Sequence, residues 1–348
     1  MTMSPTTSAV TDHPEPSRGI PVIDIASFVT GGDPAPAVDR IAHACARVGF
    51  LQVVGHGIAP ATLTAAYRAM DELLALPEAG RGAFASPDGH PFRGLSTMRA
   101  ATGAPTCHRF QICAYDDPAA AAAAGVPAQY GDYFARNVWP GQVAGLQADL
   151  LACFAEMRRV GDTLMELFAR ALGLAPAYFA PMLTHPVSDF SINSYPPQPA
   201  RDDPEPAITF REHSDSGMLT VLHQRGDYAG LQVQDLDGTW VPVPVREDAL
   251  VINIGDLMSR WTNDHWPSTR HRVVAATDPT ATRASLATFH LPNVDTVVAP
   301  LAAFVAAGDP RYEPVTPYVW EKMFLAKVYQ PREPASAGGP PRPSRPDG

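Results

Sequence analysis

His213 and Asp215 are of residue types, and at a spacing, that indicate metal chemistry. They stand two positions apart at the end of the strand-like run ITFREHSD, so an extended backbone directs both side chains to one side. His271 follows Asp215 by 56 residues (271 − 215) and begins another such run, HRVV. Two imidazoles and one carboxylate leave three adjacent coordination positions open, which suits Fe(II) centres that activate O2. We expect His271 to face the first pair across the mouth of a barrel.

A His-x-Asp pair alone is a weak signal, because 11 histidines allow it by chance or as a hydrogen-bonded core pair. Arg283 and Ser285 add a second pattern 12 residues after His271 (283 − 271), again two apart on a predicted strand. A guanidinium binds a carboxylate through two parallel hydrogen bonds, and a hydroxyl can donate another. The alternative interpretation is an arginine in an ordinary surface ion pair.

Short strands must position these residues. From about Phe190 the chain has brief runs rich in Val, Ile, Thr and Phe, separated by Pro, Gly, Asn and Asp. That spacing predicts a jelly roll or barrel. Before it, the pattern is mixed: IPVIDIASF and FLQVVGHGI are typical of strands, and helical spacing covers about 36–50, 60–76 and 143–172. A last helix, TPYVWEKMFLAKVY, is expected to pack against the outside of the barrel.

Composition limits the domain organisation and the possible partners. We expect one domain over 20–332, with a helix-rich part (20–180) and a jelly-roll core with a C-terminal helix (181–332). Residues 1–19 and 333–348 are rich in Pro, Gly, Ser and Thr and predict disordered tails. A net charge of −10 without a basic run disfavours nucleic-acid binding, and no apolar stretch approaches a membrane span. We expect a cytoplasmic protein, monomeric or weakly dimeric, whose four cysteines, without a CxxC pair, stay reduced.

The stretch VINIGDLMSRWTNDHWPSTRHRVV resembles a segment of the isopenicillin N synthase-like family of Fe(II)/2-oxoglutarate-dependent oxygenases. The resemblance extends over about 20–330 and includes GFLQVVGHGI, SINSYPP, HSDSGMLTVL, GLQV and RASLATF in the family's order. It implies an α+β fold, a double-stranded β-helix (a jelly-roll, cupin-like core) flanked by helices. It also implies a dioxygenase that hydroxylates, desaturates or cyclises a small molecule with Fe(II), 2-oxoglutarate and O2, and releases succinate and CO2.

The resemblance assigns roles to individual residues. It implies that His213, Asp215 and His271 hold Fe(II), and that Arg283, Ser285, Tyr195 and Asn193 bind 2-oxoglutarate. For the substrate pocket it indicates Phe210, Leu222, Leu231, Ala287 and Phe289, with Arg109 and Gln111 from a less securely aligned stretch. Because most of these residues are apolar, we expect a largely hydrophobic ligand with few polar contacts. Arg109 is a candidate for holding a carboxylate of a natural-product or amino-acid-derived substrate.

Other polar residues have structural explanations. We expect His56 to be structural, Asp256 and Arg272 to form an ion pair, and His290 to lie near the cavity because it follows Phe289. Two alternative functions remain open: an Fe(II) oxidase of the isopenicillin N synthase type that needs no 2-oxoglutarate, and a non-catalytic binding protein of the same fold. The sequence does not name the substrate or the bond that is oxidised.

Overall fold

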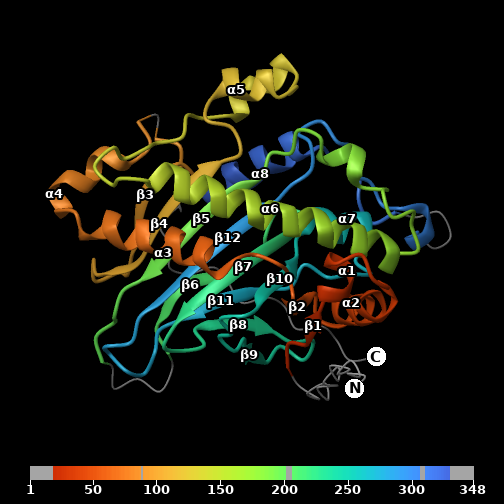
Figure 1. The fold of residues 1–348 in the computed structure, drawn as a ribbon, viewed down its shortest axis with the longest axis horizontal. Helices are drawn as coiled ribbons and strands as arrows, with labels where there is room; N and C mark the ends of the chain where they lie inside the picture. The colour runs from red at the N-terminus through yellow and green to blue at the C-terminus, as the bar shows by residue number, and fades with distance from the viewer. Residues whose placement is uncertain (1–18, 88, 201–205, 306–309, 330–348) are drawn as a thin grey trace, which may run out of the picture.

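The computed structural model describes residues 19–87, 89–200, 206–305 and 310–329, and it contains two facing β-sheets covered by helices (Figure 1). The larger sheet has eight strands in the order β1-β2-β10-β7-β12-β5-β4-β3, and the smaller has the order β6-β11-β8-β9. The strands of the larger sheet are β1 (Val22–Asp24), β2 (Phe50–Val54), β3 (Gly94–Arg99), β4 (Pro105–Cys113), β5 (Asp189–Tyr195), β7 (Leu219–Gly226), β10 (Leu250–Ile254) and β12 (Arg283–His290). Those of the smaller sheet are β6 (Ile208–His213), β8 (Leu231–Gln234), β9 (Trp240–Pro242) and β11 (His271–Val274).

Helices cover the larger sheet on the face that points away from the smaller one. In Figure 1 the long helix α6 (Leu146–Ala171) and α3 (Pro60–Ala75) cross the strands of this sheet. Phe154 of α6 stacks on Phe190 of β5 with ring centroids 5.4 Å apart, so the outward-facing side chains of the sheet form the main core with α6. The remaining helices are α1 (Ala26–Val29), α2 (Ala35–Arg47), α4 (Glu78–Arg81), α5 (Pro118–Ala123), α7 (Asp256–Trp261) and α8 (Pro317–Tyr329). Short 3-10 turns are η1 (Gly82–Phe84), η2 (Ala128–Tyr133), η3 (Ala180–Leu183) and η4 (Ala302–Phe304).

Strand register decides which residues face the space between the sheets. β12 pairs antiparallel with β5, Arg283 opposite Tyr195 and Ser285 opposite Asn193. β12 also pairs with β7, placing Ala287 beside Leu222. Because side chains alternate across a strand, the odd-numbered residues of β12 share the inner face and the even-numbered ones face α6.

The predicted fold class, an α+β double-stranded β-helix flanked by helices, is confirmed, and most predicted elements lie where the patterns placed them. The strand over IPVIDIASF is shorter than expected, since β1 ends at Asp24 and α1 follows. The hairpin of β3 and β4 was not predicted, although β4 pairs with β5 along its length. This pairing supports our proposal that 20–332 form one domain, because strands from both predicted parts share a sheet. The predicted tails, apart from Gly19, lie outside the described residues.

Helix α8 lies closer to the ends of the inner strands than predicted. The indole nitrogen of Trp320 donates to the carbonyl of Ser216, 3.2 Å away, and Phe324 stacks on Phe92 at 6.4 Å between centroids. Phe92 in turn lies 5.3 Å from the guanidinium of Arg109 on β4. The helix therefore covers one end of the space between the sheets rather than only its outside.

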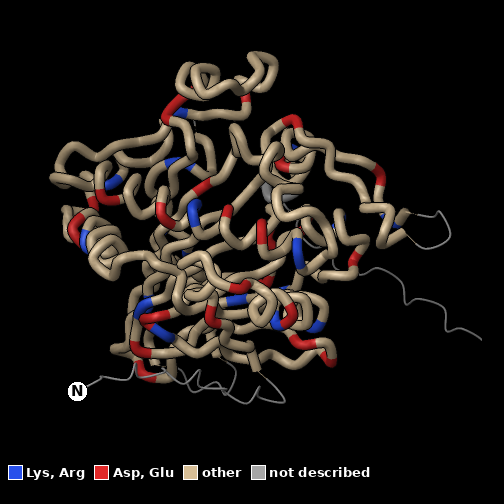
Figure 2. Tube along the Cα trace, turned by 45° about the vertical axis from the view of Figure 1, so that its right-hand side comes forward, with Lys and Arg blue, Asp and Glu red and all other residues tan. Residues whose placement is uncertain are grey.

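The surface carries both signs of charge. Figure 2 shows acidic and basic positions interspersed over the part of the chain that the structure describes. No helix among the described residues is long and apolar enough to cross a membrane.

Candidate active site

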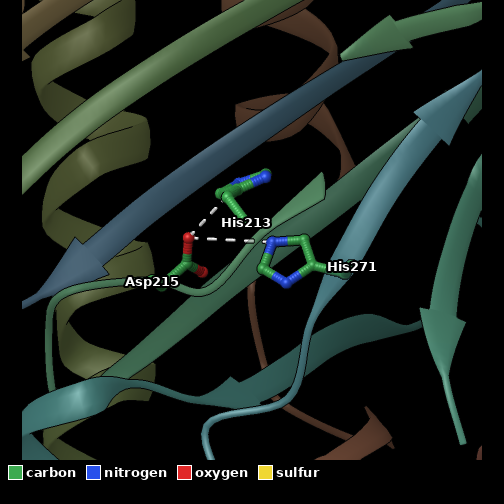
Figure 3. Close-up of side chains that lie close together, drawn as sticks. All are labelled: His213, Asp215 and His271. Carbon is green, nitrogen blue, oxygen red and sulfur yellow. Dashed lines mark ion pairs between the residues drawn. The ribbon is translucent and has the colours of Figure 1, made fainter. Parts of the chain in front are cut away.

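The two histidines of the predicted metal site lie on neighbouring strands of the smaller sheet. His271 of β11 pairs directly with His213 of β6, and their ring centroids are 4.2 Å apart. The prediction that His271 faces the pair across the barrel mouth was therefore wrong in detail. The antiparallel register brings both rings to one face, and Asp215, just beyond β6, turns toward them (Figure 3).

One carboxylate oxygen of Asp215 faces both imidazoles. Its Oδ1 lies 3.7 Å from Nε2 of His213 and 3.7 Å from Nε2 of His271. In Figure 3 the two dashed lines meet at this single oxygen. The three ligand atoms lie within 4.8 Å of one another, a spacing that a single metal ion can bridge. The donor set, two nitrogens and one oxygen, fits a non-haem Fe(II) site with open positions.

Backbone carbonyls orient both rings. Nδ1 of His213 lies 2.8 Å from the carbonyl of Arg211, and Nδ1 of His271 lies 3.2 Å from that of Thr269. A carbonyl only accepts, so Nδ1 is the protonated nitrogen in the neutral form of each ring, and Nε2 then offers its lone pair to the metal. Burial and the neighbouring His271 lower the pKa of His213 to about 4, which keeps that ring neutral at physiological pH.

Asp215 is held as a carboxylate. Burial acts to raise its pKa, but His271, His213 and two hydrogen-bond donors outweigh burial, so the net pKa lies below the usual range. The donors are the Thr220 hydroxyl at 2.5 Å and the Asn253 amide at 2.8 Å, both to Oδ2. Neutral imidazoles and an ionised carboxylate are the protonation states that a divalent cation requires.

Arg283 is buried at the inner face with hydrogen-bond donors unused. It is 2% exposed, and Nη2 donates to Oε1 of Gln224 at 3.2 Å. Within the described chain, Nε and Nη1 have no hydrogen-bond partner. The guanidinium also lies 4.8 Å from the ring centre of Tyr195. Since buried donors are almost always satisfied, these unused donors fit an acidic ligand such as a 2-oxoglutarate carboxylate.

Ser285 and Asn193 are joined in a short polar chain. Asn193 donates from Nδ2 to the Ser285 hydroxyl at 3.3 Å and accepts from the Ser191 hydroxyl at 3.2 Å. Tyr195 is 3% exposed, and burial raises its pKa, so its phenol stays protonated and can donate. The four predicted cosubstrate residues therefore lie together on β5 and β12.

A single pocket unites these groups with the metal ligands. It includes all seven predicted metal and cosubstrate residues and six of the seven predicted substrate residues: Phe210, Leu222, Leu231, Ala287, Phe289 and Arg109. Gln111 is outside this lining and is buried on β4. The lining also contains residues that were not predicted: Phe50, Ser191, Thr220, Val251, Asn253 and Val273.

Two expectations about individual polar residues were wrong. Arg272 does not pair with Asp256; its guanidinium donates to Gln232 at 2.9 Å and lies over Trp240. His290 is fully buried on the α6 side of β12, 3.2 Å from Asp162, and so faces away from the pocket. His56 has the structural environment expected, since Nδ1 accepts from the Ile58 amide at 3.2 Å.

Gln224 and Thr220 are site residues that the sequence interpretation missed. Gln224 is 1% exposed, and its amide nitrogen donates to the carbonyl of Pro244 at 2.9 Å while its oxygen accepts from Arg283. Both residues lie on β7 with Leu222, which was predicted for the pocket. The alternation Thr220, Leu222, Gln224 could have placed all three on the inner face.

Glu321 of α8 is a buried acid beside the site. It is 7% exposed, and within the described chain Oε1 has no hydrogen-bond partner. Its pKa is raised from 4.5 to about 7, mainly by burial. The nearby carboxylates of Asp189, Asp256 and Asp215 also raise this pKa, whereas the Ser216 hydroxyl lowers it. Ionised Glu321 therefore disfavours the folded state.

We expect Glu321→Gln to change how stability of the metal-free protein depends on pH. The unfolded chain ionises near pH 4.5 and the folded one near pH 7, so the wild type loses stability as pH rises through this window. The neutral amide avoids this loss, which is about 3 kcal/mol at most. Thermal unfolding should show the variant more stable than wild type at pH 8 but not at pH 4.5. An equal difference at both pH values would contradict the shifted pKa.

Sequence comparisons agree with this geometry. Residues 20–142 match the family "non-haem dioxygenase in morphine synthesis N-terminal", and residues 186–292 match the 2OG-Fe(II) oxygenase superfamily. The validamycin A dioxygenase of Streptomyces hygroscopicus subsp. limoneus is 31% identical over 309 residues, 83% of this chain and 81% of the relative. This chain belongs to the 2OG-Fe(II) oxygenase superfamily. Gibberellin 20 oxidase 1-D of Triticum aestivum is 32% identical over 321 residues, 89% of this chain and 83% of that protein.

Solved structures of other proteins share the fold. Neurospora crassa T7H, solved in complex with alpha-KG, gives a TM-score of 0.77 at 23% identity and covers 89% of this chain and 96% of its own. The rice dioxygenase for auxin oxidation gives a TM-score of 0.67 at 26% identity, and the match covers 89% of this chain and 96% of that protein's chain. The family and the cluster of ligand atoms confirm the predicted enzyme class: the chain is a non-haem Fe(II)/2-oxoglutarate oxygenase, with His213, Asp215 and His271 as its iron ligands.

Proposed function

We propose that this oxygenase oxidises a small natural-product or amino-acid-derived molecule, by hydroxylation, desaturation or cyclisation, at the pocket between the two sheets. The observation that carries the proposal is one continuous lining that joins the iron ligands, the buried Arg283 and an apolar wall. The cytoplasmic location and the monomeric or weakly dimeric state remain predictions.

The Arg283 end of the pocket is proposed to hold 2-oxoglutarate. The unused Nη1 donor would bind the far carboxylate in a charge-assisted hydrogen bond, with Ser285 and Tyr195 donating beside it. Asn193 would keep the Ser285 hydroxyl in place through its 3.3 Å contact. Bound Fe(II) and 2-oxoglutarate supply the oxidising power drawn from O2, with succinate and CO2 as co-products.

The other end is proposed to hold the substrate. Phe210, Leu222 and Phe289 give this part an apolar wall, which excludes water and packs against a carbon skeleton. Arg109 lines the same pocket with its guanidinium stacked over Phe92. We include in the proposal that Arg109 binds an acidic group of the substrate and so fixes which carbon faces the iron.

Succinate formation tests the proposal. The Fe(II)-loaded protein would be incubated with 2-oxoglutarate, O2 and a panel of acidic and neutral small metabolites. Both succinate and loss of each compound would be quantified. We expect one class of carboxylated compound to be consumed in equal amounts with succinate. The role of Arg109 would be contradicted if the wild type consumed neutral compounds in preference to acidic ones and Arg109→Gln showed the same preference.

We expect Phe289→Ala to impair use of the substrate much more than binding of 2-oxoglutarate. The ring lies in the pocket lining beyond Ala287 and away from Arg283 on the same strand. Losing the apolar contact between this half-buried ring and the substrate costs about 2 kcal/mol, or more than tenfold in substrate affinity. Succinate formed per substrate consumed should rise, since the substrate is held less firmly. Phe304→Ala, which removes a ring stacked on His265 outside the pocket, is the control. Unchanged coupling in Phe289→Ala would remove this residue from the pocket.

A further inference from the structure

The two oxygens of Asp215 have different environments. Oδ1 faces the Nε2 atoms of His213 and His271, each 3.7 Å away. Oδ2 accepts from the Thr220 hydroxyl at 2.5 Å and from the Asn253 amide at 2.8 Å. One oxygen of the carboxylate thus faces the two histidines, as Figure 3 shows, and the other is hydrogen-bonded to the protein.

The two donors are fixed by the larger sheet. Thr220 of β7 and Asn253 of β10 are direct partners in the antiparallel ladder, and they are 2% and 3% exposed. Asp215 belongs to the loop after β6, in the smaller sheet, and is 5% exposed. The hydrogen bonds to Oδ2 therefore connect the loop that carries the ligand to the centre of the opposite sheet.

We propose that Thr220 and Asn253 are positioning residues that make Asp215 a one-oxygen ligand of the iron. An ionised carboxylate has about four lone-pair sites, two on each oxygen. The two donors use those on Oδ2, so only Oδ1 remains to bind the metal. Binding through one oxygen leaves the neighbouring coordination position open, where a carboxylate bound through both oxygens would occupy it. The side chains also fix the direction of Oδ1, because a carboxylate held at one oxygen cannot rotate about its Cβ–Cγ bond.

Thr220→Val tests this proposal because valine keeps the shape and removes only the hydroxyl donor. Fe(II) affinity would be measured anaerobically by competition with a chromophoric chelator. We expect the affinity to fall about tenfold to hundredfold, as is typical when a residue orienting a metal ligand is lost. Thr220→Ser should restore an affinity near that of wild type. A crystal structure of the Co(II)-loaded wild type should show Oδ1 alone bound to the metal.

Thr288→Val is the matched control. Thr288 lies on the adjacent strand β12 beside Val221, is fully buried and faces α6, and within the described chain its hydroxyl has no hydrogen-bond partner. Its replacement makes the same chemical change in the same sheet without removing a bond to Asp215. We expect Fe(II) affinity to be unchanged.

Three outcomes would overturn the proposal. One is wild-type affinity in Thr220→Val, another is an equal loss in Thr288→Val, and the third is Oδ2 bound to the metal in the wild-type crystal. If Thr220→Val fails to fold, judged by circular dichroism of the metal-free protein, Asn253→Leu replaces it and the same affinity criteria apply.

Discussion

Replacing Asp215 or His271 with alanine should abolish iron binding and turnover while the protein stays folded. Each supplies one of three ligand atoms that lie within 4.8 Å of one another. Losing an orienting residue costs about tenfold to hundredfold in metal affinity, so losing a ligand should cost more than about a hundredfold. Fe(II) content after anaerobic loading and desalting measures this directly.

Folding of these variants should change little. In the metal-free protein the carboxylate is buried beside two imidazoles, and its removal leaves the donors of Thr220 and Asn253 free to bind water. His265→Ala is the control for His271→Ala, because His265 stacks on Phe304 and is outside the pocket lining. Full iron content and activity in His271→Ala would remove that residue from the metal site.

The metal site was predictable because its signal is local. His213 and Asp215 stand two apart, and the order of motifs around His271 resembles a known family, so the ligands could be named without the fold. The sequence did not contain the strand register. His213 and His271 are direct partners on β6 and β11, and no local pattern shows that two runs 58 residues apart (271 − 213) will pair.

Partners that depend on register were missed for the same reason. Gln224 contacts Arg283 because β7 and β12 are neighbours, and the residues are 59 positions apart. The error over His290 has another origin. Phe289 faces the pocket, so the alternation of a strand directs the next residue to the opposite side, toward Gly161 and Asp162 of α6. The fit there is close, since a Cβ on Gly161 would lie 2.9 Å from Nδ1 of His290.

The hairpin of β3 and β4 illustrates a limit of periodicity. Its sequence, GLSTMRAATGAPTCHRFQIC, mixes polar and apolar residues on both strands. Both faces of β4 are packed against other parts of the protein. Phe110 on one face belongs to the core with α6, and Arg109 on the other face lines the pocket. A strand with a polar functional face therefore lacks the clean alternation from which a half-buried strand is predicted.

Arg283→Gln should leave iron bound but weaken 2-oxoglutarate binding strongly. The change removes the charge and the unpaired guanidinium donors, of which we assign Nη1 to the far carboxylate. Hydrogen bonds of this charged kind contribute roughly 1.5–3 kcal/mol, which corresponds to a rise in dissociation constant of about tenfold to hundredfold. Anaerobic titration of the Fe(II) protein with 2-oxoglutarate, followed through the visible charge-transfer absorption of the chelate, measures the constant without a known substrate.

Arg225→Gln provides the matched comparison for this measurement. Arg225 lies on the neighbouring strand β7, but it is exposed on the α3 side, where its guanidinium pairs with Asp71 at 3.0 Å and lies over Tyr67. The same substitution there should leave the 2-oxoglutarate constant unchanged, because an exposed ion pair contributes little and lies outside the pocket. If Arg283→Gln binds 2-oxoglutarate as tightly as wild type, or if Arg225→Gln weakens binding equally, the far carboxylate is held elsewhere. The orphaned donors of Arg283 would then need another acidic partner, and the direction in which the cosubstrate lies along β12 would have to be reversed.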